Sequence, residues 1–289
     1  MRLPTHLAEK IGLVSGAKGR EWVSRFDSVL REAVEKWGLE ELQPFENLSF
    51  HFVARARQGG TPVVLKLGVS ERWLVRESGA LTAFEGGPVP RLLGADLSLA
   101  AMLLEDVQPG IPLAEEWSEP DDETHTVILA ETMVALWRDP PASHSFDTTH
   151  SLAKAFERET RFVPRDLVER AAQTWRELEA TAPAPKLIHG DLHHGNVLRS
   201  EVGHKAIDPM GVVGDPGFEV YALLHNPVQA TNKQTIRLIE PRLRTVSAVT
   251  GIEIGRLRAW GFCGIVLSSC WDEEDGGEPT DFELAEVLL

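Results

Sequence analysis

The chain has 289 residues, 43% of them hydrophobic, which is enough to bury one large core or two modest ones. Its formal net charge of −15, with no lysine or arginine cluster to offset it, repels a phosphate backbone and excludes nucleic acid as an expected partner. Two cysteines are too few for a disulfide framework, and the opening "MRLPTHLAEK" lacks the apolar run of a signal peptide. No apolar stretch approaches the ~20 residues that span a membrane. We therefore expect a soluble, cytoplasmic protein without a membrane partner, and a monomer rather than an oligomer.

The first part of the chain predicts the order helix, hairpin, helix, hairpin. Apolar residues recur at helical spacing over 20–37, and Gly38 can end that helix. Residues 48–57 and 61–67 have the pattern of two strands, and "QGG" between them is typical of a tight turn. A second helix is predicted over 71–84, followed by two short apolar segments, "RLLGA" and "LAAMLLEDV".

The second part of the chain is predicted to be mostly helical. It opens with a segment rich in proline and acid, residues 108–123, which we interpret as the joint between two domains, 1–107 and 108–289. The helical patterns after it are 124–138, 166–180 and 255–271. Cys263 and Cys270 are expected to be buried thiols on the last of these helices.

One β-like region interrupts the helices and carries the chemistry. Residues 189–196, "HGDLHHGN", lead into two short segments, "NVLRS" and "HKAID", that can form a hairpin centred on Val202. Counting outward from that centre makes Asn196 and Asp208 direct cross-strand neighbours, whose oxygens can share one Mg²⁺. Asp191 then lies on the loop before the first strand. The spacing Asp-x-x-x-x-Asn, strand, turn, Asp matches the catalytic loop and metal aspartate of protein kinases and predicts phosphoryl transfer.

Longer strings of the sequence resemble a known family. "VVLKL", "MLLEDVQPG", "HGDLHHGNVL" and "AIDPMGVVGDPGFEVYALLHNP" follow the order found in the aminoglycoside and hydroxyurea phosphotransferases, a group that includes streptomycin 6-kinases. The similarity runs from about Phe45 to Gly276. It implies an α+β, two-lobed protein-kinase-like fold with ATP between the lobes: a small N-terminal antiparallel sheet with a helix, and a larger, mainly helical C-terminal lobe with the catalytic loop and substrate site. It also implies ATP and Mg²⁺ as cofactors and antibiotic resistance through O-phosphorylation, although GTP is left open as the donor.

The same resemblance assigns roles to individual residues. Lys66 matches the lysine that holds the α- and β-phosphates, and Glu77 matches the helix glutamate that pairs with it. Asp191 matches the catalytic base, while Asn196 and Asp208 match the magnesium ligands. The backbone groups that hydrogen-bond adenine are matched by three consecutive residues, Glu105, Asp106 and Val107.

Several positions depart from the family pattern or have a structural interpretation. The loop "NLSFHFVA" contains no glycine, so Ser49 and neighbouring N–H groups must replace a glycine-rich phosphate cradle. His51 stands where relatives that read "SYNYVA" have asparagine, and Glu219 stands where "GDPxFD" has an aspartate. The roles of these two residues are left open. Asp215 is predicted to cap a helix that begins at Pro216.

The histidines of "HGDLHHGN" permit a rival hypothesis. His189 and His193 have the i, i+4 spacing of two zinc ligands, but no glutamate lies between them, and Gly190 and Gly195 disfavour a helix. A metal-dependent hydrolase is therefore the remote alternative, and His189 is expected to fix the loop by packing and hydrogen bonding. An inactive kinase-like binding module would have lost a ligand, and every residue matched to a ligand or base is present.

Charge predicts the acceptor. Two acid-rich stretches, 115–123 and 272–283, flank the helical part, and a surface of one sign concentrates ligands of the opposite sign. Streptomycin or a similar cationic aminoglycoside is the expected acceptor, with hydroxyurea or another small metabolite as the alternative. The acceptor is expected to contact four consecutive acidic residues, Asp272, Glu273, Glu274 and Asp275.

Overall fold

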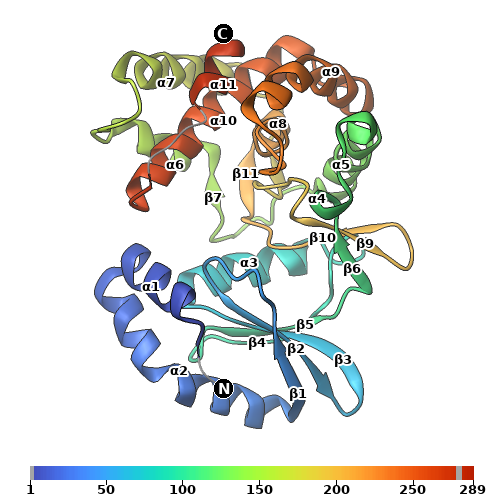
Figure 1. The fold of residues 1–289 in the computed structure, drawn as a ribbon. Coiled ribbons are helices and arrows are strands. Elements are labelled where there is room, and N and C mark those ends of the chain that lie inside the picture. The colour runs from blue at the N-terminus through green and yellow to red at the C-terminus, as the bar shows by residue number, and fades with distance from the viewer. Residues whose placement is uncertain (1–2, 278–281) are drawn as a thin grey trace. The chain divides into compact units, whose positions relative to one another are not determined.

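The structure is a computed structural model that describes residues 3–277 and 282–289 (Figure 1). Its chain divides into two compact units. Unit 1 comprises Met1–Glu85 with Pro90–Val107, and unit 2 comprises Gly86–Val89 with Gln108–Leu289. The main division falls between Val107 and Gln108, and the short segment Gly86–Val89 belongs to the second unit. Within the described ranges, no helix is long and apolar enough to cross a membrane.

Unit 1 consists of one antiparallel sheet and three helices. The five strands have the order β1-β2-β3-β5-β4. They are β1 (Leu39–Pro44), β2 (Phe52–Gln58), β3 (Thr61–Leu67), β4 (Leu92–Asp96) and β5 (Ala101–Glu105). The helices are α1 (Thr5–Val14), α2 (Gly16–Trp37) and α3 (Glu71–Ala83).

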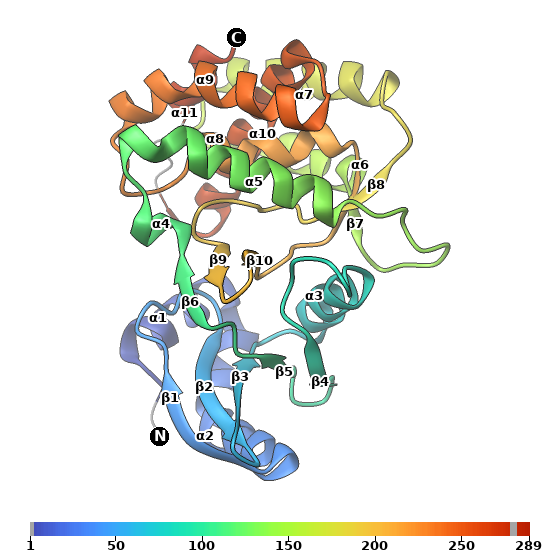
Figure 2. The same cartoon turned by 90° about the vertical axis from the view of Figure 1, so that its right-hand side faces the viewer.

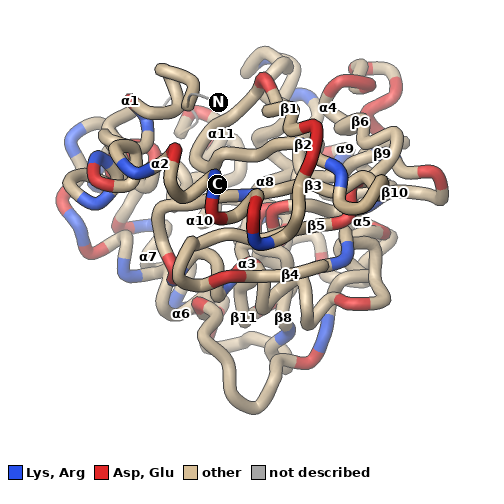
Figure 3. The backbone as a smooth tube through the Cα atoms, turned by 90° about the horizontal axis from the view of Figure 1, so that it is seen from below, with Lys and Arg blue, Asp and Glu red and all other residues tan. Residues whose placement is uncertain are grey.

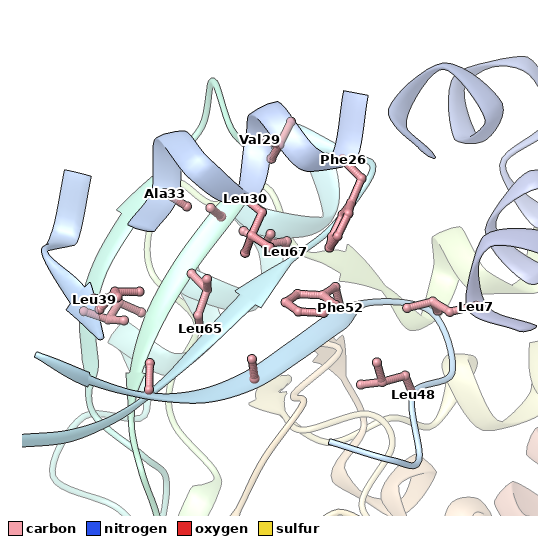
Figure 4. Close-up of a cluster of buried hydrophobic side chains, with 14 of the residues drawn as sticks. Leu7, Phe26, Val29, Leu30, Ala33, Leu39, Leu48, Phe52, Leu65 and Leu67 are labelled. Atoms are coloured by element: carbon pink, nitrogen blue, oxygen red, sulfur yellow. The ribbon is translucent and has the colours of Figure 1, made fainter. Parts of the chain in front are cut away.

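The core of unit 1 lies between α2 and the central strands. Figure 4 shows Phe26 and Leu30 of α2 pointing toward Phe52, Leu65 and Leu67 of the sheet, and all five are buried. The Phe26 and Phe52 ring centroids lie 4.9 Å apart in an edge-to-face arrangement. On its exposed side α2 intersperses charges of both signs, as a solvated helix face does (Figure 3).

Three features of unit 1 differ from the expectation. Helix α1 and strand β1 were not predicted, and β2 begins at Phe52 instead of residue 48. Strand β1 gives no alternating signal because only its first residue, Leu39, is buried. Helix α2 ends as expected, at Gly38, which adopts a left-handed φ of 60°.

Unit 2 is mainly helical. Its α-helices are α4 (Leu113–Glu116), α5 (Asp122–Leu136), α6 (Thr149–Leu152), α7 (Arg165–Ala180), α8 (Val220–Leu224), α9 (Asn232–Thr250), α10 (Ile254–Glu274) and α11 (Phe282–Val287), and its 3₁₀ turns are η1 (Glu119–Asp121), η2 (Ala153–Glu157) and η3 (Pro216–Glu219). Two three-stranded sheets have the orders β10-β9-β6 and β7-β11-β8. Their strands are β6 (Pro109–Pro112), β7 (Asp147–Thr148), β8 (Lys186–Ile188), β9 (Val197–Ser200), β10 (His204–Ala206) and β11 (Val212–Gly214). The acidic segment after residue 108 is therefore structured and is not a simple joint.

Helix α10 runs through the core of unit 2. Its Trp260 is fully buried, and the ring centroid lies 4.9 Å from that of Trp175 in α7. Cys263 and Cys270 are free, buried thiols on this helix, as expected from the sequence. The buried surroundings raise the pKa of Cys270 to about 11, which keeps the thiol protonated and unreactive.

A buried ion pair fastens α5 to α9, which lie side by side (Figure 2). The guanidinium of Arg242 donates to both carboxylate oxygens of Asp122, and the two side chains are 0% and 4% exposed. Arg242 Nη1 also donates to three backbone carbonyl groups, those of Leu223, Leu224 and Asn226. Asp122 accepts a further hydrogen bond of 2.8 Å from the indole of Trp117. Both charges are thus fully compensated, which is the condition for burying them.

Candidate active site

The loop 189–196 connects β8 to β9 and is held by a tight backbone turn. Gly190 has a left-handed φ of +86°, and a Cβ atom there would lie 2.7 Å from the side chain of Val212. Both observations require glycine at this position. Gly190 therefore fixes the turn of the backbone between β8 and Asp191.

His189 fixes this loop from inside unit 2. Its Nε2 donates to the carbonyl oxygen of Ile207 at 2.9 Å, and its Nδ1 accepts from the N–H of Asp191 at 3.3 Å. A carbonyl oxygen can only accept, so the ring must be neutral with its proton on Nε2. Burial lowers the pKa of His189 to about 4, in agreement with that tautomer. The expected structural role of His189 is confirmed.

The same contacts bear on the zinc hypothesis. Both ring nitrogens of His189 are used by the loop, and Nδ1 of His193 accepts from the N–H of Gly195 at 3.0 Å. His194 is fully buried, and burial lowers its pKa well below the ordinary value. In the part of the chain that the structure describes, no three His, Cys, Asp or Glu side chains are arranged to hold a metal ion.

Glu219 and Tyr221 clamp the peptide group that precedes Asp191. The N–H of Gly190 points at the two carboxylate oxygens of Glu219, at 3.2 and 3.3 Å, and the Tyr221 hydroxyl donates to the carbonyl oxygen of Gly190 at 2.9 Å. Both side chains are buried, and burial raises the pKa of Glu219 to about 8 and that of Tyr221 well above its ordinary value. Glu219, whose role the sequence left open, therefore positions the loop that carries Asp191.

Asp191 has the environment of a proton acceptor. Burial raises its pKa to about 7; the charge of Asp208 acts in the same direction, whereas His225 and a hydrogen bond from Asn196 oppose the rise. The side chain is 43% exposed, so contact with solvent limits this effect. A carboxyl group that titrates close to neutral pH is well matched to taking a proton from a hydroxyl group.

The hairpin after the loop differs from the expectation by one residue. Val197 pairs with Ala206 and Arg199 with His204, and the N–H of Ile207 donates to the carbonyl oxygen of Asn196 at 2.8 Å. Asn196 therefore faces Ile207, and the prediction that it faces Asp208 directly is wrong.

The turn explains this shift. The N–H of Ser200 donates to the carbonyl oxygen of Gly203 at 2.9 Å, which leaves Glu201 and Val202 as a two-residue turn in place of a three-residue turn centred on Val202. Asp208, the residue after Ile207, has a left-handed φ of 58°, so the chain turns out of the strand there.

Asn196 and Asp208 nevertheless form a suitable pair of oxygen donors. The amide nitrogen of Asn196 donates to the backbone oxygen of Asp191 at 2.9 Å and to its Oδ2 at 3.2 Å, so the amide oxygen is the atom directed to other partners. Asp208 is close enough to raise the pKa of Asp191 through its charge. An amide oxygen and a carboxylate are ligands that Mg²⁺ prefers.

Unit 1 contains the expected lysine–glutamate pair. Lys66 Nζ lies 2.8 and 3.0 Å from the two carboxylate oxygens of Glu77, and the two residues are 2% and 4% exposed. This ion pair between β3 and α3 is confirmed. A buried lysine that is held by one carboxylate keeps its charge in a fixed place.

The other residues matched to the nucleotide site also lie in unit 1. Glu105 ends β5, and its carboxylate accepts from the N–H of Arg91 at 3.0 Å. Asp106 lies 3.5 Å from the guanidinium of Arg55, and Val107 is buried. Ser49 is exposed in the loop between β1 and β2. The side chain of Glu105 thus contacts the residue that precedes β4, and that of Asp106 lies near a residue of β2.

The acidic residues predicted to meet the acceptor have partners of their own. Glu273, near the end of α10, accepts from the backbone N–H groups of Arg161, Phe162 and Val163, and Glu274 pairs with Arg158. These two carboxylates tie the segment before α7 to α10, a role that the sequence did not reveal. Asp272 and Asp275 belong to the same helix end, and residues 278–281 of the acidic stretch lie outside the described residues.

Asp215 does more than cap a helix. It accepts from the N–H of Gly217 at 2.8 Å, which confirms the predicted cap of η3. It also accepts from the indole of Trp260 at 2.8 Å and from Nε of Arg256 at 2.7 Å. Arg256 in turn donates to the carbonyl oxygen of Leu178, so this carboxylate joins η3, α10 and α7.

Comparisons with known proteins agree with this arrangement. The family model for aminoglycoside/hydroxyurea antibiotic resistance kinases matches residues 36–276. A hydroxyurea phosphotransferase of Kitasatospora aureofaciens is 31% identical, and the match covers 100% of this chain and 86% of that protein. A streptomycin 6-kinase of Streptomyces glaucescens is 27% identical over 100% of this chain and 97% of that protein.

A solved structure supports the fold. A thermostable mutant of aminoglycoside phosphotransferase APH(4)-Ia, in a ternary complex with ADP and hygromycin B, matches with a TM-score of 0.64 at 17% identity, over 90% of this chain and 97% of that one. The expected protein-kinase-like fold, with a small antiparallel sheet and a larger helical part, is confirmed. The chain belongs to the aminoglycoside/hydroxyurea antibiotic resistance kinase family and is a phosphotransferase that acts on small molecules.

Proposed function

We propose that this enzyme transfers the γ-phosphoryl group of ATP to a hydroxyl group of a cationic aminoglycoside such as streptomycin, and that this modification confers resistance. The observation that carries the proposal is the position of Asp191, in a loop locked by His189 and Glu219, with a pKa raised to about 7 and Asn196 at hydrogen-bond distance. ADP in the related phosphotransferase complex supports ATP as the donor.

Each residue has a defined task in this proposal. Asp191 accepts the proton of the acceptor hydroxyl group as that oxygen attacks phosphorus. Asn196 and Asp208 would hold Mg²⁺, which when bound neutralises charge on the phosphate oxygens. Lys66, fixed by Glu77, binds phosphate oxygens, and Ser49 contributes a hydroxyl donor from its loop. The backbone of three residues, Glu105, Asp106 and Val107, binds adenine.

The reaction requires no protein or nucleic-acid partner. Its substrates are a nucleotide and a small molecule, both of which are found in the cytoplasm, where we place the enzyme. We propose that a single chain is sufficient, because unit 2 itself contains the base and both candidate metal ligands.

The metal assignment makes a prediction of its own. Asp208→Asn should weaken Mg²⁺-dependent ATP binding at least ~10-fold, because a charged oxygen ligand is lost, while adenosine binding stays unchanged. Titration calorimetry with each ligand, with and without Mg²⁺, measures both. Glu201→Gln, in the exposed turn of the same hairpin, is the matched control. Equal ATP affinity of Asp208→Asn and the parent protein in Mg²⁺ would refute this ligand assignment.

The acceptor is tested through its charge. Because Glu273 and Glu274 are needed by the fold, we replace only Asp272 and Asp275, with asparagine. This double variant should raise the KM for streptomycin several-fold without lowering kcat, since only binding common to ground and transition states is lost. The KM for streptomycin should also rise with salt, because ions screen charges over roughly 8 Å at physiological ionic strength.

A control and an alternative accompany this test. Glu9→Gln with Glu32→Gln removes two exposed charges from α1 and α2 and should leave the KM unchanged. Hydroxyurea, the alternative acceptor, is neutral and would show no salt dependence. A higher kcat/KM for hydroxyurea than for streptomycin, or a KM for streptomycin that ignores salt, would show that the acceptor assignment is wrong and would leave the kinase assignment standing.

A further inference from the structure

We propose that His51 is an additional phosphate-binding residue of the nucleotide site, and that Trp73 and Gly68 hold its imidazole ring for that task. His51 departs from the family pattern, in which relatives have asparagine, and the proposed function gives it no role. The inference rests on the proposed function, because it takes Lys66 to bind the phosphates. All four residues belong to unit 1.

The strand register places His51 beside Lys66. In the β2–β3 hairpin Val53 pairs with Lys66 and Phe52 with Leu67, so the next pair in the same register is His51 with Gly68. Side chains two residues apart on a strand share a face, and directly paired residues share a face as well. His51 therefore belongs to the face of the sheet from which Lys66 extends, one diagonal position away from it.

Close contacts at Gly68 support this placement. A Cβ atom on Gly68 would lie 2.4 and 2.5 Å from Cε3 and Cζ3 of Trp73, and 2.9 Å from Cδ2 of His51. These distances are far below van der Waals contact, so the two rings lie directly on the backbone of Gly68. Glycine is thus the residue that lets both rings occupy the end of β3.

The two rings are stacked on each other. The centroids of His51 and Trp73 are 3.9 Å apart, and their planes differ by 24°. The ammonium group of Lys66 lies 5.3 Å from the Trp73 centroid. One indole, from the first turn of α3, therefore contacts both the imidazole ring and the buried ammonium group. A stacked imidazole loses little further freedom when it binds a ligand, which favours its use as a fixed donor.

The composition of the loop explains why a side-chain donor is needed. The loop between β1 and β2, residues 45–51, contains no glycine, so its backbone has less freedom to follow phosphate oxygens closely than a glycine-rich loop has. An imidazole N–H group is a good donor to a phosphate oxygen, and a hydrogen bond to a charged acceptor is stronger than a neutral one. His51 can thus add a direct side-chain contact to those of Ser49 and the loop backbone.

The decisive variant is His51→Phe, because it keeps an aromatic ring on Trp73 and removes the N–H group. We expect the Kd for ATP with Mg²⁺ to rise on the order of tenfold and the Kd for adenosine to stay unchanged. Gly68→Ala keeps both side chains but forces the rings to move. It should also weaken the binding of ATP more than the binding of adenosine. Titration calorimetry on the full chain measures both ligands. His150→Phe, at an 83% exposed side chain in α6, is the matched control.

The outcomes separate this inference from the function on which it rests. The comparator is Lys66→Met with Glu77→Met, which removes both partners of the buried ion pair together. The inference is overturned if the comparator weakens ATP binding and His51→Phe does not. It is also overturned if His51→Phe weakens the binding of ATP and of adenosine equally, because His51 then only packs the loop. If the comparator binds ATP normally, the proposed nucleotide site itself is wrong. Selective loss of ATP affinity in both proteins supports the assignment.

Discussion

Asp191→Asn should reduce kcat by at least ~10²-fold while the enzyme continues to bind ATP with Mg²⁺. The substitution keeps the size of the side chain and an oxygen that can accept from Asn196, but it removes the group that takes the proton. The nucleotide contacts that we assign to unit 1 do not involve residue 191. Steady-state kinetics with streptomycin and calorimetry with ATP give the two quantities.

The fold of this variant must be checked, because Asp191 belongs to a loop locked by Glu219 and Tyr221. Thermal unfolding of Asp191→Asn should match that of the parent protein, and Glu201→Gln should match it in every measurement. Near-normal phosphoryl transfer by a folded Asp191→Asn protein would remove Asp191 from the mechanism. If Asp191→Asn loses both its activity and its ATP binding, Asp191 binds nucleotide instead of acting as the base.

Arg242→Met should lower the free energy of unfolding by about 3–5 kcal/mol, the usual cost of leaving one partner of a buried ion pair alone. The buried carboxylate of Asp122 would lose the guanidinium that compensates it, and three carbonyl groups in and after α8 would lose their donor. Urea unfolding, followed by circular dichroism, measures this change. Arg244→Met, two residues further along α9 and 71% exposed at the side chain, should cost less than ~1 kcal/mol.

A double variant distinguishes the causes of this loss. Arg242→Met with Asp122→Leu removes both charges and should recover part of the stability, because the penalty of the unpaired carboxylate disappears. No recovery would mean that the hydrogen bonds to the three carbonyl groups dominate. A loss for Arg242→Met as small as that for Arg244→Met would contradict the structural role given to this pair.

Local patterns in the sequence were sufficient for several of the elements and for placing the loop 189–196 between two strands. Helix α2 and its end at Gly38 follow from apolar periodicity and one glycine, and both depend only on neighbouring residues. The structural role of His189 could be expected because the glycines around it exclude a helix. The pair Lys66 and Glu77 was expected from the resemblance to a family, which matched both residues, and the structure shows the ion pair.

Contacts between distant residues could not be predicted in this way. Glu273 binds backbone groups about 110 residues away, and Arg242 binds a carboxylate 120 residues away, so neither partner leaves a local signal. The hairpin register failed for a different reason. A turn of two or three residues fits "EVG" equally well, and one hydrogen bond between Ser200 and Gly203 decides between them. Strand β1 was missed because its exposed residues show no alternation.

We propose that this protein phosphorylates a hydroxyl group of a small molecule with ATP, with Asp191 as the base. Mass spectrometry of streptomycin after incubation with the parent protein, ATP and Mg²⁺ tests it most directly, with Asp191→Asn and a reaction without Mg²⁺ run in parallel. We expect the parent protein to yield streptomycin that carries one phosphoryl group and an equal amount of ADP. Asp191→Asn should form both products at least ~10²-fold more slowly, and the reaction without Mg²⁺ should form neither. ADP formed without any phosphorylated acceptor, or phosphorylated streptomycin produced equally by Asp191→Asn, would contradict it.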